Sequence, residues 1–313
     1  MNQQFSLISK YRSSIMGVAA LMIVAFHLHV LGMLPDWTKY LLRFSFVGVD
    51  MFLFLSGLGL CYSINKDGNL FHFYEKRFKR IFPSFIIVVL ICGIGHKEEW
   101  WDVLLGFSGL NYWLAPIFNL NPYFWYVSLM ILLYFLFPWL YKFIEESSTM
   151  KISYFIIGLI LFPYIIHFAL TNSYDYALPR MLPFTLGIIA YSFRQRRKTL
   201  ERNFIIISII TFLILNVYSF FMSGQNIHKT LIQFSLLGLI GPGASCIISI
   251  ILNKKPLRWL NHILTPVGHV SLELYLVHLA MLIWFKDIFT LLLSSTLVTY
   301  LVYKVTKQIS NRL

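Results

Sequence analysis

The sequence predicts an all-α polytopic membrane protein, in which residues 1–313 form one bundle of about ten transmembrane helices. Hydrophobic residues make up 58% of the chain and charged residues only 12%, with a mean hydropathy of +0.70, a balance that no soluble globular domain of this length needs. Apolar runs of near-spanning length recur along it, since about 20 residues cross the hydrocarbon core at about 1.5 Å per residue. They lie at about 14–34, 44–64, 80–96, 123–144, 152–171, 177–194, 203–222, 230–252, 265–285 and 287–305.

The distribution of basic residues predicts the orientation of the bundle. With a cytoplasmic N-terminus, 20 of the 26 Lys and Arg residues fall inside and six outside. By the positive-inside rule, both termini should be cytoplasmic. The net charge of +13 therefore reflects topology, and we expect no nucleic-acid partner.

The first apolar run, Ile15 to Leu34, carries two imidazoles, His27 and His29. Ionisable groups at such depth are costly and usually face a bundle interior or a wet cavity. At about 100° per residue the two rings point about 200° apart, so we expect only one of them to serve a site.

The second run carries an acid, Asp50, close to its predicted outer end, together with Gly48, Ser56 and Gly59. The small residues favour a helix-packing face. Asp50 has two interpretations: a carboxylate that caps the helix N-terminus, or a group that fixes the tautomer of a nearby histidine.

Before the third run, Arg77 and Arg80 lie three residues apart on one helical face, and Lys76 and Lys79 widen the positive surface. Positive-inside anchoring explains such a cluster in general. The sharper interpretation is a phosphate site, because guanidinium groups bind phosphoryl oxygens in pairs.

The segment 97–120 contains Trp100, Trp101, Tyr112 and Trp113, and we expect it to lie at the outer membrane interface.

Further along, Arg180 is predicted at the outer mouth of the sixth span, where it either binds an anionic group or extends to lipid headgroups.

The ninth run carries His269, Glu273 and His278. Glu273 and His269 are four residues apart, one helical turn, and are expected to pair. His278 is about 180° round the helix from His269 and is expected to line a cavity. Cys61, Cys92 and Cys246 show no paired spacing, so we expect neither a disulfide framework nor a metal site.

Taken together, six stretches resemble the acyltransferase-3 family of integral membrane O-acyltransferases, which acylate cell-surface polysaccharides, lipopolysaccharide and related glycans. They occur in order and cover most of the chain: GVAALMIVAFH (17–27), GVDMFLFLSGLGL (48–60), KRFKRIFP (76–83), FWYVSLMILLYFLFP (124–138), RMLPFTLGIIAY (180–191) and VSLELYLVH (270–278). Two positions depart from the family pattern: Met16 stands where an arginine is usual, with Arg12 one turn earlier, and Met130 stands where many members have a glutamate.

The resemblance implies a bacterial inner-membrane enzyme in which His27 is catalytic and acyl-CoA, most often acetyl-CoA, is the donor. We expect no permanently bound cofactor, and the acceptor is a hydroxyl of a cell-surface polysaccharide or lipid-linked glycan. Arg12, Arg77 and Arg80 suit the phosphates of cytoplasmic CoA, and Arg12 lies about 22 Å along the helix from His27. Asp50 would orient His27, while Arg180 and His278 would contact the acceptor.

His27 acts either as a general base or as the acyl carrier, and the residues do not separate these routes. They also leave open acetyl against longer acyl groups, the acceptor sugar and homo-oligomerisation. Two other functions stay as alternatives: a transporter or flippase of a lipid-linked saccharide, and an inactive family member, for which Met16 is the support.

Overall fold

The computed structural model describes residues 6–96, 100–118, 124–169, 174–221 and 228–312, and within these ranges it is helical with no strand. The α-helices are α1 (Ser6–Lys10), α2 (Arg12–Val30), α3 (Lys39–Leu42), α4 (Val47–Lys66), α5 (Leu70–His96), α6 (Trp100–Ser108), α7 (Asn111–Phe118), α8 (Trp125–Glu146), α9 (Thr149–Ala169), α10 (Met181–Ser192), α11 (Arg197–Phe221), α12 (His228–Asn253), α13 (Leu260–His269), α14 (Ser271–Trp284) and α15 (Ile288–Arg312).

Eight of the ten predicted spans appear as helices long and apolar enough to cross a membrane, or nine spans if one bent pair counts as a span. The eight are α2, α4, α5, α8, α9, α11, α12 and α15, and the count applies to the described part of the chain. The prediction of an integral membrane bundle is thus supported, whereas the count of ten is not.

The two remaining predicted spans depart from a straight crossing for different reasons. The run 177–194 folds as α10, whose 12 residues extend about 18 Å and are too short for a hydrocarbon core of about 30 Å. The run 265–285 is divided into α13 and α14, which meet at 71° across Val270.

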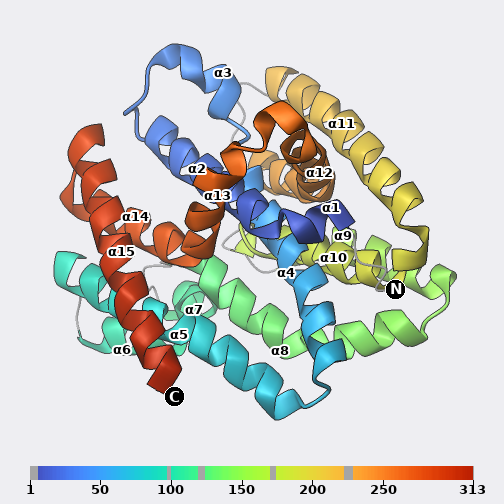
Figure 1. The fold of residues 1–313 in the computed structure, drawn as a ribbon, viewed down its shortest axis with the longest axis horizontal. Coiled ribbons are helices and arrows are strands. Elements are labelled where there is room, and N and C mark those ends of the chain that lie inside the picture. The colour runs from blue at the N-terminus through green and yellow to red at the C-terminus, as the bar shows by residue number, and fades with distance from the viewer. Residues whose placement is uncertain (1–5, 97–99, 119–123, 170–173, 222–227, 313) are drawn as a thin grey trace.

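Helix α4 runs through the middle of the bundle (Figure 1), and 94% of its most apolar stretch is buried. Its contact with α10 is close because a glycine of each helix faces the partner backbone: a Cβ at Gly187 would lie 2.2 Å from the Phe54 carbonyl oxygen, and one at Gly57 would lie 2.1 Å from the Phe184 carbonyl oxygen. On the other side, a Cβ at Gly48 would lie 2.5 Å from the Ala19 carbonyl oxygen of α2. The expected packing role of Gly48 is therefore confirmed, and α4 holds α2 and α10 in fixed positions.

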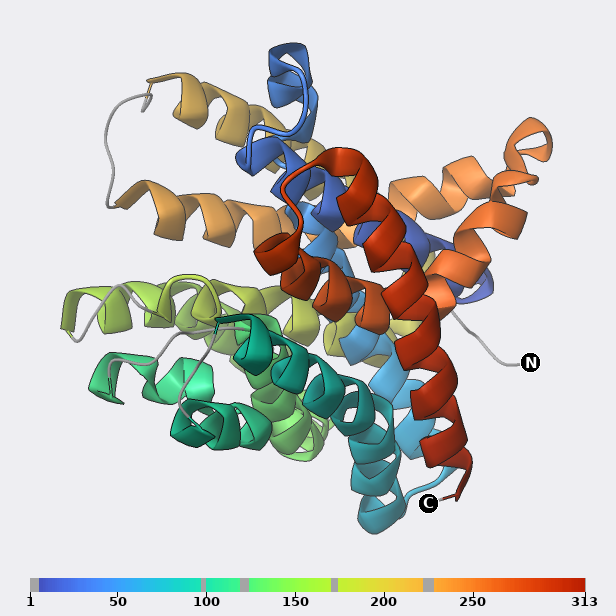
Figure 2. The same cartoon turned by 90° about the vertical axis from the view of Figure 1, so that its left-hand side faces the viewer.

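Basic residues from three elements gather at one end of the bundle. Figure 2 shows the C-terminal end of α15 beside the turn that joins α4 to α5. Lys76, Lys79, Arg80 and Lys307 line one cavity there, while Arg12 and Arg77 line another. The segment 100–118 forms α6 and α7, both too short to cross a bilayer, and its interfacial location stays a prediction.

Candidate active site

A cavity of about 340 Å³ opens between the start of α2, the second half of α4 and the start of α5. Arg12 and Arg77 line it from α2 and α5. Arg77 Nη2 donates a hydrogen bond of 2.8 Å to Ser63 Oγ, and Arg12 Nη2 lies 3.4 Å from the Leu55 carbonyl oxygen. Gly59 leaves the space that Arg12 occupies, because a Cβ there would lie 3.0 Å from Arg12 Nη2. Each guanidinium thus makes one of these hydrogen bonds and has further N–H donors that could bind a ligand in the cavity.

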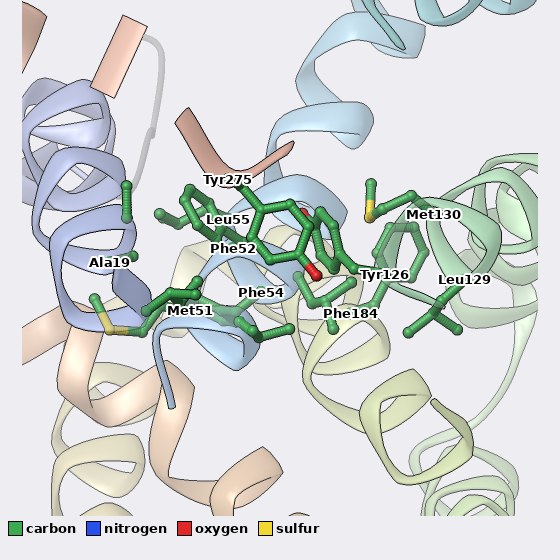
Figure 3. Close-up of a cluster of buried hydrophobic side chains, with 14 of the residues drawn as sticks. Ala19, Met51, Phe52, Phe54, Leu55, Tyr126, Leu129, Met130, Phe184 and Tyr275 are labelled. Carbon is green, nitrogen blue, oxygen red and sulfur yellow. The ribbon is translucent and has the colours of Figure 1, made fainter. Parts of the chain in front are cut away.

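A second, smaller cavity of about 70 Å³ continues deeper into the bundle, and Ser56 and Tyr134 line both. Its wall includes Tyr126 and Tyr275, whose ring centroids are 5.0 Å apart. Figure 3 shows these two rings next to each other beside α4, where they meet edge to face at an interplanar angle of 60°. The two cavities adjoin at Ser56 and Tyr134, and we refer to the pair, from Arg12 and Arg77 at one end to Tyr275 at the other, as the path.

Both departures from the family pattern lie on the wall of this second cavity: Met16 comes from α2 and Met130 from α8. Positions where an arginine and a glutamate are usual therefore flank one space across the bundle. Both of the usual charged side chains are replaced by flexible apolar ones. The loss of the arginine therefore does not leave the glutamate without a charged partner, and the reverse also holds.

The path leads toward two imidazoles that the sequence did not predict to meet. His278 Nε2 lies 3.1 Å from His27 Nδ1, although 251 residues separate them. Tyr275, on the cavity wall, is one turn before His278, with ring centroids 5.9 Å apart. Both nitrogens of His278 are engaged, since Nδ1 lies 2.8 Å from the Leu274 carbonyl oxygen. Within the described structure both ring nitrogens of His278 thus have protein partners, and its contact with the acceptor stays a prediction.

Asp50 does not lie against His27, which corrects the expectation that it would orient His27. Its carboxylate makes no hydrogen bond in the described part of the chain, and its charged neighbour is Arg180, with Nε 3.6 Å from Oδ1. A Cβ at Gly241 of α12 would lie 2.8 Å from the Asp50 Cβ, so α12 packs directly onto this position. Asp50 is thus fixed beside a guanidinium instead of an imidazole.

Arg180 is also not at a mouth: it and Asp50 are both 0% exposed. Three rings surround its guanidinium, those of Phe46, Trp125 and Phe234, at 4.5, 5.1 and 4.1 Å from the ring centroids. The preceding 3-10 turn, Leu178–Arg180, turns the side chain inward, where Nη1 donates to the Tyr176 carbonyl oxygen at 2.9 Å. Neither headgroup contact nor substrate contact fits this sealed position.

Arg80 has a carboxylate partner that the sequence analysis assigned to His269. Arg80 Nη1 lies 2.7 Å from Glu273 Oε1, and Ser84 Oγ donates to the same oxygen at 3.0 Å. The bend at Val270 ends the helical register between His269 and Glu273, so they are no longer one turn apart on a continuous helix. Arg80 lines the inner cavity and is only partly available for a phosphate.

Other side chains at the site carried no signal in the sequence. Ser56, Tyr126, Tyr134 and Tyr275 look like ordinary residues of apolar spans, and only their shared cavities set them apart. The buried pair of His167 Nδ1 and Asp175 Oδ2, 2.8 Å apart, was also missed.

Within the described ranges, no group of three His, Cys, Asp or Glu side chains is placed to hold a metal ion.

The described helices and these cavities define a polytopic membrane protein in which a histidine pair, His27 and the buried His278, lies beside the inner cavity at Tyr275. The model of a family described as an acyltransferase domain matches residues 15–305, and the chain belongs to this acyltransferase-3 family. A protein of Acidianus two-tailed virus named "Putative acetyltransferase ORF330" is 26% identical over 282 residues, covering 85% of this chain and 81% of that protein. No solved structure matches the chain.

Proposed function

We propose that this membrane acyltransferase moves an acetyl group from cytoplasmic acetyl-CoA to a hydroxyl of a cell-surface polysaccharide or lipid-linked glycan. The observation that carries the proposal is the path of two cavities that share Ser56 and Tyr134, begin at Arg12 and Arg77, and end at Tyr275 beside the histidine pair. A donor with phosphates at one end and a thioester at the other fits such a path.

Arg12 and Arg77 bind the phosphates of CoA in this proposal, because charge-assisted hydrogen bonds from guanidinium to phosphate are strong and geometrically specific. Both face the larger cavity, and both extend from the end of the bundle where the basic residues gather. Arg80 contributes to the wall of the path while Glu273 holds it. Placing this end in the cytoplasm follows from the distribution of Lys and Arg.

His27 is the catalytic residue of the proposal and acts through Nε2. Its Nδ1 has two neighbours, the Ile23 carbonyl oxygen at 3.0 Å and His278 Nε2 at 3.1 Å. Nε2 makes no hydrogen bond in the described part of the chain and is not among the fully buried polar atoms that lack a partner. An accessible, unengaged nitrogen is what a general base or an acyl carrier needs.

The first test is transfer from labelled acetyl-CoA into cell-envelope glycan by the full-length protein, with His29→Ala as the matched control for His27→Ala. Both variants remove an imidazole from α2, two residues apart. We expect His27→Ala to abolish transfer and His29→Ala to retain it at equal expression. Unchanged incorporation by His27→Ala would overturn the assignment of the catalytic residue.

A second measurement tests the reaction class itself. Purified protein that neither binds CoA nor transfers acetyl, but moves a labelled lipid-linked saccharide across vesicles, would replace the enzyme with a transporter. Trapping of labelled acetyl on His27 in the absence of acceptor would identify the covalent route, whereas its absence together with a ternary-complex rate law would identify the general-base route.

A further inference from the structure

We propose that His278 is a positioning residue and proton partner for His27: its Nε2 accepts the Nδ1 hydrogen of His27 and stabilises the imidazolium that forms during transfer. The inference rests on the proposed function and assigns a role to the second imidazole of that site. The two ring centroids are 5.1 Å apart at an interplanar angle of 51°, and the nitrogens are within hydrogen-bonding distance at 3.1 Å.

The backbone determines where the hydrogen of His278 lies. Its Nδ1 is 2.8 Å from the Leu274 carbonyl oxygen, one turn earlier on α14. A carbonyl oxygen only accepts, so Nδ1 carries the hydrogen, and the neutral ring has its lone pair at Nε2. That lone pair faces His27 Nδ1.

The same reasoning applied to His27 gives an independent and consistent result. Its Nδ1 is 3.0 Å from the Ile23 carbonyl oxygen, which requires a hydrogen on Nδ1. This one hydrogen is shared between Ile23 and the lone pair of His278. A hydrogen on His278 Nε2 would instead require a lone pair on His27 Nδ1, facing the Ile23 oxygen. The two carbonyls therefore select one arrangement, with the lone pair of His27 at Nε2.

This arrangement prepares Nε2 for the general-base route. The acceptor hydroxyl gives its proton to His27 Nε2 while its oxygen forms a bond to the thioester carbon. As the C–S bond breaks, CoA leaves as a thiolate and receives that proton. Between these events His27 is a cation, and its Nδ1–H donates a charge-assisted bond to His278 Nε2.

In the part of the chain that the structure describes, no carboxylate forms an ion pair with His27 or His278. Asp50 is engaged with Arg180, and Glu273 with Arg80 and Ser84. His278 is 3% exposed and lies on α14, whose direction differs by 71° from that of α13. The bend that separates Glu273 from His269 thus also sets the course of the helix that carries His278.

The test compares His278→Gln with His278→Phe in full-length protein in lipid nanodiscs, with His29→Ala as the control. A glutamine Oε1 can accept from His27 Nδ1, whereas a phenylalanine ring fills the space without an acceptor. We expect His278→Phe to lower kcat about 100-fold with an unchanged KM for acetyl-CoA, and His278→Gln to stay within about 10-fold of wild type. Wild-type kcat in His278→Phe, or equal losses in both variants with a raised KM, would overturn the proposal.

A second measurement does not depend on activity. In protein labelled with ¹⁵N-histidine, a scalar coupling between His27 Nδ1 and His278 Nε2, transmitted through the hydrogen bond, is expected in wild type and absent in His278→Phe. Its absence in wild type overturns the proposal even if acetyl transfer is observed. A wild-type coupling without acetyl transfer would uphold the pair and overturn the proposed function, so the two failures are distinguishable.

Discussion

Two arginine environments in this bundle differ in what surrounds the guanidinium groups. Arg12 and Arg77 line a cavity of about 340 Å³, and neither forms an ion pair with a carboxylate among the described residues. Arg180 is 0% exposed, enclosed by three aromatic rings and paired with an equally buried Asp50. The difference shows that a buried cation in a membrane protein indicates a binding site only when a cavity accompanies it.

The largest expected effect comes from breaking the Asp50–Arg180 pair. Arg180→Met leaves a carboxylate in a sealed position and should destabilise the protein by about 3–5 kcal/mol, as removal of one partner of a buried pair does. Asp50→Leu should have a comparable cost, and the double variant should be more stable than either single one. Thermal unfolding in detergent measures all three, and single variants as stable as wild type would mean that the pair is not energetically coupled.

Arg77→Ala tests the arginines that line the cavity. Unlike the Asp50 and Arg180 variants, it should change the KM for acetyl-CoA and not the stability. Loss of charge-assisted hydrogen bonds worth about 1.5–3 kcal/mol should raise the KM for acetyl-CoA about 10- to 100-fold, with little change in Tm. Lys76→Ala is the matched control, because Lys76 is a neighbouring cation on α5 that lines a different cavity. Equal effects of the two substitutions would move the phosphate site to the cavity lined by Lys76, Lys79 and Lys307.

Substitutions at Met16 and Met130 test whether a charged side chain, alone or with a partner of opposite charge, is tolerated in the inner cavity. Met16→Arg alone should lower kcat/KM about 10-fold, because it adds a second guanidinium to the cavity that Arg80 lines, whereas Met130→Glu alone should cost less because Arg80 lines the same cavity. The double variant should recover most of that loss if the two side chains reach each other across the cavity. Additive losses in the double variant would show that they do not.

The smallest effect is expected at Asp67, whose ion pair is exposed. Lys76 donates a hydrogen bond of 2.9 Å to its carboxylate and lowers the pKa of Asp67 below its usual range. A lowered pKa adds stability above the unfolded value of about 3.9, and that stability is lost as pH falls through the folded value. Since solvent screens the pair, Asp67→Asn should leave Tm and transfer at pH 7 unchanged. A clear loss of Tm would contradict this.

Much of the fold could be predicted from the sequence because hydrocarbon imposes one simple requirement, a long apolar helix with its backbone groups satisfied internally. On this basis eight of the ten predicted spans correspond to helices that are long and apolar enough to cross a membrane. The prediction failed for 177–194, because an apolar run buried by other helices does not have to span, and for 265–285, because the bend lies inside a continuously apolar stretch.

The candidate site was predictable only one residue at a time. His27 and His29 stood out because ionisable groups are rare in such spans, Arg77 because it lies in a basic cluster, and the family resemblance favoured His27 and Arg12. Their partners did not stand out: Glu273 was paired with His269 because they are one turn apart in the same run, and Asp50 was expected to orient His27 of the preceding run. The structure pairs Glu273 with Arg80, 193 residues away, and Asp50 with Arg180.

The sequence by itself determined the membrane-spanning character and most of the spans, because these follow from local composition, whereas the choice of His27 as the candidate catalytic imidazole came from the family resemblance. The tertiary structure decided which charges neutralise one another, which guanidinium groups keep open space, and that His278 meets His27 across 251 residues. The physical reason is range: hydropathy and helical period act within one helix, whereas ion pairing, cavities and imidazole tautomers depend on how helices far apart in the chain are packed.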